Sequence, residues 1–367
     1  MEHGLSFLPD SDGVSGPSAA AYFSMVLDLA KLADKAGLSH VKMTEHYMRA
    51  YGGFCPSPLS FLAAVAAVTT RIRLMTGCLL PVFHHPVQLA SETAMVDALS
   101  HGRLDVGFAR AYLPYEFDAL GVAMDGSRER FDLTVDLVRR LWAGEQVSVQ
   151  SEHFDFEGVE TLPRPVQRPG PPIWIAAVMS RKSFVNAGLH GFGLLITPSI
   201  SPLTEVAGLV ATYRESFRPQ RAGDVPRVLA SLPLFVGRDD AHATATADPL
   251  LNRYLEVWAQ STDSWSTRGS ADYRGYTGMS YAVRSMTPQK MRAVGGAIVG
   301  GPEAVVGQIG EVARLLDVDG FLWQVDFGGV GADVARASVE RLIASVLPEL
   351  EREAPGVLAT GTERGGR

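Results

Sequence analysis

Cysteine is scarce in this sequence: the 367 residues contain only Cys55 and Cys78. Two cysteines in so long a chain exclude a disulfide scaffold and a metal site made of several cysteines, and we expect a reducing, cytoplasmic environment. Long apolar runs are missing too, since the richest stretch, 59–68, is about half of the roughly 18 residues that a membrane span requires. The N-terminal segment lacks both a basic region and a long apolar one, so we expect no secretory signal.

Basic residues are fewer than acidic ones. Lysine and arginine number 33 against 40 aspartates and glutamates, which gives a formal net charge of −7. This balance argues against a broad surface for nucleic acid or for an anionic membrane. The sequence also lacks a GxGxxG loop, a Walker A loop and a GxSxG elbow in the expected context. With 46% hydrophobic and 20% charged residues, the composition indicates a soluble protein with a large core that acts on small molecules.

Short β-like runs alternate with amphipathic helices along most of the chain, and no repeat of fixed period interrupts the alternation. This order predicts an α/β fold: one (β/α)₈ TIM-barrel domain with insertions over residues 1–350. Strands are expected at 3–8, 40–44, 72–80, 104–108, 173–178, 193–197, 228–236 and 320–326. Helices are expected at 17–37, 58–70, 86–99, 125–142, 180–189, 203–217, within 239–258, at 302–316 and at 332–346.

Three segments fall outside this alternation. Residues 147–157 resemble a small hairpin that lies outside the barrel. The stretch 260–292 is long, polar and aromatic with weak periodicity, which is typical of a mobile lid-like loop. The segment 351–367 is rich in glycine and charge, and we expect a flexible tail.

Candidate site residues stand where predicted strands end, because barrel enzymes gather their active sites there. His46 follows the second strand and could serve as a general acid or base, or be an ordinary loop histidine bonded to a carbonyl group. Gly77, next to Cys78, could let the backbone approach a ligand closely, or kink the strand to close the barrel. We expect no metal at His84 and His85, because adjacent histidines rarely bind one ion and no carboxylate stands at ligand spacing.

An anion site is predicted at the next two strand ends. Arg110 ends an apolar run, and Ser180 and Ser183 stand at the start of the following helix. An arginine fork with hydroxyls at a helix N-terminus suits a phosphate group. The alternatives are an arginine salt-bridged on the rim and a serine that only caps its helix.

Four stretches carry a resemblance to a known family. They read EHYMRAYGGFCPSP (45–58), TTRIRLMTGCLLPVFHHPVQLASETAMVDALSHGRLDVGFARAYLPYEFDALGV (69–122), PRPVQRPGPPIWIAA (163–177) and GGPEAVVGQIGEVARLLDVDGFLWQVDFGG (300–329). They look like the bacterial-luciferase-like flavin-dependent monooxygenases. The resemblance covers about residues 3–350 and is weakest across 238–292.

The resemblance implies a luciferase-like barrel that binds reduced FMN and lets it react with O₂. A C4a-(hydro)peroxyflavin would then oxidise a small organic substrate, for example a natural-product intermediate. The residues matched to the family's cofactor site are Arg110, Ser180 and Ser183 for the phosphate, Tyr112, Val178 and Met179 for further contacts, and Gly77–Cys78, a non-prolyl cis bond in relatives, behind the flavin ring. His46 matches the active-site histidine, and substrate contacts are expected from Tyr47, Ala109, Tyr276 and Tyr281.

Two positions depart from the luciferase pattern. Ala109 stands where the luciferase catalytic subunit has a cysteine, and Tyr47 stands where a second histidine is common. We therefore do not expect light emission from a long-chain aldehyde. The resemblance leaves two further functions open: an F420-dependent oxidoreductase that transfers hydride, and a flavin-binding protein without catalytic activity.

Two partners are expected. No NAD(P)H-binding fingerprint is present, which fits a separate NAD(P)H:flavin reductase that supplies the reduced flavin. The helix at 58–70 is apolar nearly all round, and one barrel can cover only one side of it. We therefore expect a homodimer that buries this helix together with the helix at 86–99, in the manner of the family.

Overall fold

The computed structural model describes residues 1–14 and 16–353. Eight parallel strands form its centre: β1 (Glu2–Phe7), β2 (His40–Met43), β3 (Arg73–Thr76), β4 (Leu104–Phe108), β7 (Ile173–Ala177), β8 (Gly193–Ile196), β9 (Val228–Val236) and β11 (Gly320–Gln324). They pair in chain order, and the sheet closes because β11 pairs with β1. The predicted (β/α)₈ TIM barrel is confirmed.

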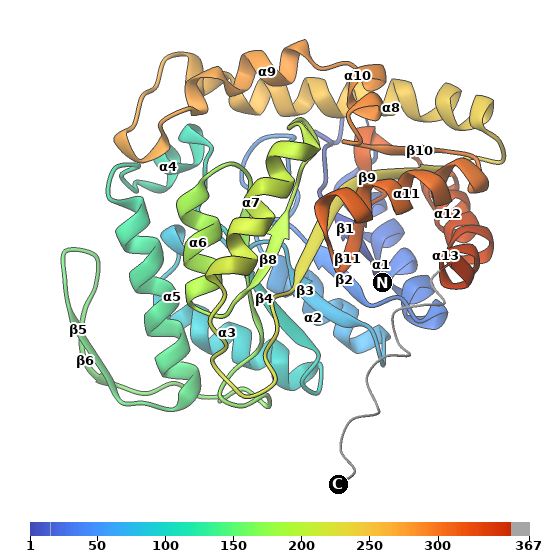
Figure 1. Ribbon diagram of the computed structural model, residues 1–367. Coiled ribbons are helices and arrows are strands. Elements are labelled where there is room, and N and C mark those ends of the chain that lie inside the picture. The colour runs from blue at the N-terminus through green and yellow to red at the C-terminus, as the bar shows by residue number, and fades with distance from the viewer. Residues whose placement is uncertain (15, 354–367) are drawn as a thin grey trace, which may run out of the picture.

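Helices surround the barrel, and the N-terminal strand lies in its wall (Figure 1). They are α1 (Ala19–Ala36), α2 (Pro58–Val68), α3 (Pro86–Leu99), α4 (Pro114–Leu120), α5 (Ser127–Ala143), α6 (Arg181–Leu189), α7 (Leu203–Ser216), α8 (Asp240–Thr262), α9 (Met279–Ser285), α10 (Pro288–Ala293), α11 (Pro302–Leu316), α12 (Ala332–Arg341) and α13 (Leu347–Glu353). Within the described ranges, none of these helices has the length and apolar character needed to cross a membrane.

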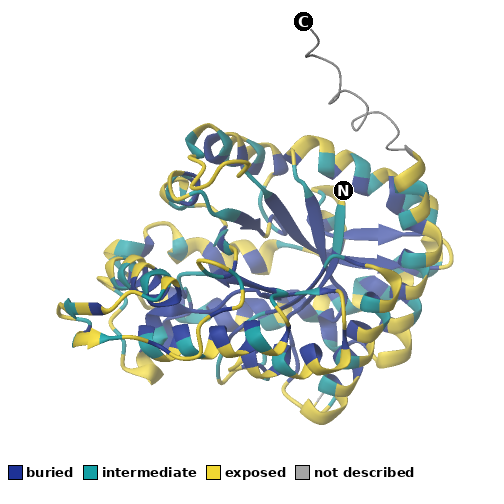
Figure 2. Cartoon of the chain, turned by 90° about the horizontal axis from the view of Figure 1, so that it is seen from below, coloured by how far each residue is buried: buried dark blue, intermediate teal, exposed yellow. Residues whose placement is uncertain are grey.

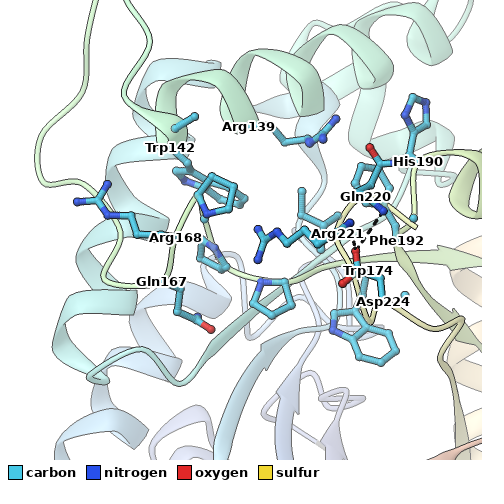
Figure 3. Close-up of a pocket in the computed structure, with 18 of the residues that line it drawn as sticks. Arg139, Trp142, Gln167, Arg168, Trp174, His190, Phe192, Gln220, Arg221 and Asp224 are labelled. Carbon is cyan, nitrogen blue, oxygen red and sulfur yellow. Dashed lines mark hydrogen bonds between the residues drawn. The ribbon is translucent and has the colours of Figure 1, made fainter. Parts of the chain in front are cut away.

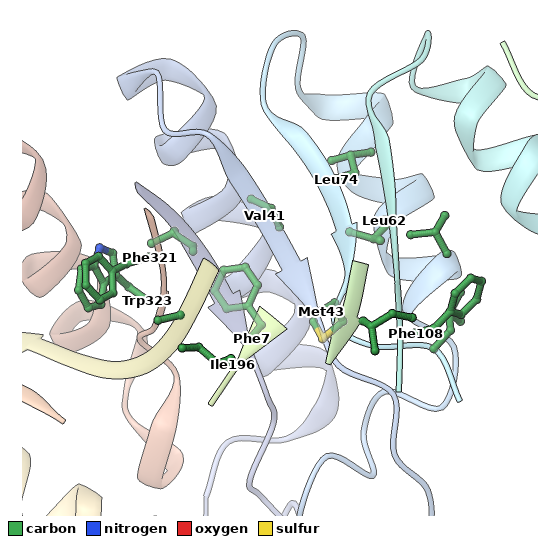
Figure 4. Packing of buried hydrophobic residues seen from close by; sticks show 14 of the residues in the cluster. Phe7, Val41, Met43, Leu62, Leu74, Phe108, Ile196, Phe321 and Trp323 are labelled. Atoms are coloured by element: carbon green, nitrogen blue, oxygen red, sulfur yellow. The ribbon is translucent and has the colours of Figure 1, made fainter. Parts of the chain in front are cut away.

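Three clusters of buried apolar side chains are present among the described residues: one joins α8 and α9 to β9, and the other two belong to the barrel. The larger lies between the strands and the helices, where Phe7, Val41 and Phe108 from three strands share one cluster with Leu62 of α2 (Figure 4). Figure 2 shows the same division, with buried strands inside and helices exposed on their outer faces. The smaller cluster joins strands from around the barrel and therefore lies inside it: Met75, Cys78, Trp174, Leu195, Leu229 and Leu322.

Local sequence explains where several elements begin and end. Ser18 accepts a hydrogen bond from the Ala21 amide and caps α1, and Gly37 ends it in the left-handed conformation. Ser57 caps α2 in the same way through the Ser60 amide, and Pro58 occupies the first turn. The predicted helix starts at these positions are confirmed.

The structure corrects the predicted element list in several places. The strand expected at 72–80 ends at Thr76, because the Thr76 hydroxyl bonds both backbone groups of Gly107 and replaces the ladder there. The short helix α4 and the strand β10 (Ile298–Gly300), which pairs with the end of β9, were not predicted. The expected helix at 332–346 changes at Leu342–Val346 into a π-helical turn that leads into α13.

The three segments predicted outside the strand–helix alternation agree with the structure to different degrees. The hairpin is present as β5 (Val147–Gln150) and β6 (Asp155–Val159). The prediction of an irregular loop at 260–292 is wrong, since α8 continues to Thr262 and short helices follow, including α9 and α10. The expected tail begins too early, because α13 runs to Glu353, and its remainder lies outside the described residues.

Candidate active site

The candidate residues converge at the carboxyl ends of the barrel strands. His46 follows β2, Gly77 and Cys78 follow β3, Arg110 follows β4 and Ser180 follows β7. These four strands are neighbours in the barrel wall. The structure therefore brings together residues that lie up to 134 positions apart in the sequence.

His46 is paired with a buried carboxylate. Its Nδ1 lies 3.0 Å from Oε1 of Glu116, which also accepts a hydrogen bond from the Tyr47 amide. His46 is 5% exposed and Glu116 is fully buried. A carboxylate at Nδ1 holds the proton there, so Nε2 of the neutral ring can accept a proton. Glu116 thus stands where the alternative of an ordinary loop histidine expected a backbone carbonyl group.

Sequence reasoning missed Glu116. It lies on α4, the short helix that begins at Pro114 and was not predicted. The one sequence feature that could have indicated it is its place six positions after Arg110, within a stretch that resembles the family. Nothing in that spacing alone connects it with His46.

The neighbouring carboxylate, Glu45, links the segment after β2 to the segment after β3. It accepts hydrogen bonds from the Tyr47 hydroxyl, the Leu80 amide and Nε2 of His84. Burial lowers the pKa of His84, but the bond and charge of Glu45 outweigh it and the net shift is upward. His85 instead caps α3 by accepting from the Val87 amide. Both histidines therefore have structural partners.

The backbone after β3 is packed closely against β2. The Gly77–Cys78 peptide bond is cis, as expected. A Cβ atom at Gly77 would come within 2.1 Å of Cγ of Lys42, so only glycine fits against that lysine. Cys78 is 4% exposed, and burial raises the pKa of its thiol to about 12, which argues against a nucleophile.

Arg110 is partly buried, and one of its nitrogens makes no hydrogen bond to the part of the chain that the structure describes. Its Nη2 donates to the carbonyl oxygen of Asp272 at 2.8 Å, and its guanidinium lies 4.0 Å from the centre of the Tyr273 ring. Nη1 is inaccessible to solvent and has no hydrogen-bond partner among the described residues; the Asp272 carboxylate is 4.0 Å away. A buried unpaired donor of this kind is costly unless an acceptor binds it. The arrangement fits an incoming anion such as a phosphate.

A second arginine joins this site. Arg128 of α5 donates to the Ser183 hydroxyl at 3.2 Å, and both residues line, with Arg110, a small cavity of about 90 Å³. Ser180 is the N-cap of α6, but its side chain makes no capping bond, so the capping alternative is wrong. The sequence analysis did not select Arg128, because it belongs to the charged run SRERFD (127–132), which is typical of an exposed helix start. Val178 and Met179, beside this turn, are exposed.

Aromatic residues of the 260–292 segment cover the same end of the barrel. Trp265 and Tyr273 are buried, so aromatic side chains anchor this segment, which the sequence presents as polar and weakly periodic. The Tyr276 ring lies 6.1 Å from the Tyr112 ring and 5.4 Å from the Trp265 ring, which forms an aromatic wall next to Ala109 and Arg110. Tyr281 is 80% exposed on α9, and the structure does not bring it to the others.

A larger cavity lies elsewhere. It has a volume of about 790 Å³ and is lined by Arg139, Trp142, Arg168, Trp174 and Arg221 (Figure 3). It opens near the amino ends of β7 and β8, where barrel residues generally serve stability. Size therefore does not identify the site in this protein; the convergence of His46, Glu116 and Arg110 at the opposite end does.

The fold and this site define the class: a (β/α)₈-barrel enzyme with an arginine donor that lacks a hydrogen-bond partner within the described ranges and a histidine–carboxylate pair at the carboxyl end of the strands. A family model described as luciferase-like monooxygenase matches residues 1–318. The chain belongs to this family, and it is an enzyme of the flavin-dependent monooxygenase class.

Individual relatives agree with this placement. The monooxygenase RslO1 from Streptomyces bottropensis has a similar structure, with a TM-score of 0.81 and 34% identity over 95% of this chain and 99% of that one. The oxygenase component of a flavin-dependent trigonelline monooxygenase from Acinetobacter baylyi is 25% identical over 330 residues, 89% of each chain. An F420-dependent glucose-6-phosphate dehydrogenase from Kineococcus radiotolerans is 33% identical over 156 residues, 41% of this chain and 45% of that one. The cofactor is therefore of the flavin or F420 type.

Proposed function

We propose that the protein is an FMNH₂-dependent monooxygenase that uses O₂ to oxidise a small organic molecule. The observation that carries this proposal is the buried, unpaired Nη1 of Arg110 beside Arg128 and Ser183. These groups suit the phosphate of FMN. Reduced FMN, when bound, would supply the electrons that activate O₂.

The remaining roles follow from the positions of the side chains. His46 would accept and return a proton at Nε2, with Glu116 holding the ring in place. The aromatic wall of Tyr112, Trp265 and Tyr276 would exclude water and contact a sizeable organic substrate, such as a natural-product intermediate. A separate NAD(P)H:flavin reductase and a cytoplasmic location belong to the same proposal.

A second candidate is hydride transfer with F420, which the F420-dependent relative favours. Anaerobic titration with FMNH₂ and with reduced F420, followed by a pulse of O₂, separates the two. Tight binding of FMNH₂ and a transient flavin–oxygen adduct after the pulse are expected. Binding of reduced F420 alone would favour the dehydrogenase, and FMNH₂ binding without any adduct would favour a non-catalytic flavin-binding protein.

Limited proteolysis tests whether 260–292 is a mobile lid. Trypsin is expected to cut the apo protein first at the exposed Arg268 or Arg274. FMN should slow these cuts, because a phosphate on Arg110 would hold the neighbouring Asp272 in place. Cleavage at the exposed Arg221, far from this site, is the control and should not change. Equal rates with and without FMN at all three sites would remove the lid role.

Sedimentation tests the proposed homodimer. The outer surface of α2 and α3 exposes Ala64, Ala67, Val68, Met95 and Leu99. Burying such a surface on a second copy removes apolar area from water, so a dimer is expected at micromolar concentration. Met95→Glu together with Leu99→Glu should give monomers with an unchanged fold. A wild-type protein that sediments as a monomer would contradict the prediction.

A further inference from the structure

The layer of inward-facing side chains nearest the carboxyl ends of the strands is polar on one side. Ser6 on β1 is in register with Lys42 on β2 and with Gln324 on β11. Ser231 of β9 completes the group, because its hydroxyl lies 3.2 Å from that of Ser6. All four side chains are at least nine-tenths buried. Alternate residues of a strand share a face, so Gln324 points inward like Leu322 of the inner cluster.

Lys42 spans the interior of the barrel. Its Nζ donates to the Ser231 hydroxyl at 3.4 Å, although β2 and β9 are separated by β1 and β11 in the sheet. The ammonium group has three N–H donors, and among the described residues only this one hydrogen bond uses any of them. At 3.4 Å the bond is also long. A buried ammonium group with so few partners is costly unless something else binds it.

Other buried groups in this layer also lack partners. Nε2 of Gln324 and Oδ1 of Asp326, which follows β11, have no hydrogen-bond partner in the described part of the chain. Burial raises the pKa of Asp326 to about 7. Its other oxygen accepts from the Leu8 amide and the Tyr22 hydroxyl, and no carboxylate of the described residues forms an ion pair with Lys42. Burial lowers the pKa of Lys42, and the charge of Asp326 opposes this shift only in part. The polar side of the layer therefore offers unused hydrogen-bonding groups and an amine that a bound anion would hold in its charged form.

Three small residues lie on the opposite side of the mouth. Gly77, Ala109 and Ala176 follow or end β3, β4 and β7, and the phosphate anchor Arg110 lies on the same side. A flat ring attached to an anchored phosphate would extend over these small residues toward the barrel axis. The stem of Lys42 packs against Gly77 through Cγ, Cδ and Cε, and its Nζ continues across the interior to Ser231. A ring that reaches the barrel axis would therefore end beside the far half of this side chain.

We propose that Lys42 supplies the positive charge that binds the anionic form of reduced FMN, so that the site selects reduced over oxidised flavin. Reduced FMN near neutral pH carries a negative charge on the pyrimidine part of its ring, whereas the oxidised ring is neutral. A single buried ammonium group next to that edge discriminates between the two forms. This inference rests on the proposed FMN-dependent function, and it explains why a long side chain with one weak bond is kept inside the barrel.

The test compares the affinities of the full-length protein for FMN and, under anaerobic conditions, for FMNH₂. Lys42→Met removes the charge and the donors, and Lys42→Gln removes the charge but keeps a donor. Each is expected to lower the preference for FMNH₂ by about tenfold or more while binding oxidised FMN nearly as the wild type does. Arg110→Ala is the matched control: the phosphate is the same in both redox states, so both affinities should fall by one factor and their ratio should not change.

Each outcome has one meaning. Wild-type protein that binds neither form of FMN refutes the proposed function, and the lysine is then not at issue. Wild-type binding with an unchanged ratio in Lys42→Gln overturns the role of Lys42 alone. Thermal unfolding monitors the fold of both variants, and the midpoint potential of bound FMN gives an independent readout, which should become more negative when reduced FMN loses its charged partner.

Discussion

Replacing His46 by alanine is expected to lower the yield of oxidised product by about a hundredfold, the lower end of the effect of a general acid–base group. The reason is the loss of Nε2, the atom that Glu116 leaves free to accept and return a proton. FMN affinity should stay nearly intact, since the phosphate anchor lies on other strands. Product and H₂O₂ are measured for the same amount of FMNH₂ with any organic substrate that is turned over, and H₂O₂ should rise as product falls.

Glu116→Gln provides the matched variant for this prediction. The amide can still accept the Nδ1 hydrogen but carries no charge, so a smaller loss of product is expected than with His46→Ala. A fully active His46→Ala enzyme would return His46 to the role of a loop residue. A Glu116→Gln enzyme with wild-type yield would show that the carboxylate positions His46 without influencing its proton.

Arg110→Ala is expected to weaken FMN binding by ~1.5–3 kcal/mol, the scale of a hydrogen bond to a charged group. This corresponds to an affinity about ten- to a hundredfold lower. The unpaired Nη1 is the atom that a phosphate oxygen would satisfy. Isothermal titration with FMN measures the loss.

Riboflavin serves as the control for Arg110, because it has the ring but no phosphate. Its affinity should hardly change in the Arg110→Ala variant. If FMN loses no more affinity than riboflavin does, the phosphate binds elsewhere. Arg110→Lys, which keeps the charge without the fork of donors, should recover part of the binding.

The sequence determined the elements of the barrel and most of the strand-end residues. Strand and helix signals are local, because a buried face repeats every two residues in a strand and about every 3.6 in a helix. Ser57 and Pro58 by themselves predict the start of α2. Arg110 stands out because it ends an apolar run, and His46 because it follows a predicted strand. The weakly periodic stretch 260–292 carried no such signal, so α9, α10 and the burial of Trp265 were missed.

The tertiary structure alone decided which distant polar groups meet. Glu116 bonds His46 across 70 positions, and Arg128 bonds Ser183 across 55. Lys42 reaches Ser231 across 189. These contacts depend on the closure and register of the whole barrel, and a one-residue shift in a strand would turn each side chain to the other face. The residue types of the site can therefore be read along the chain, whereas its hydrogen-bond partners exist only once all eight strands have closed.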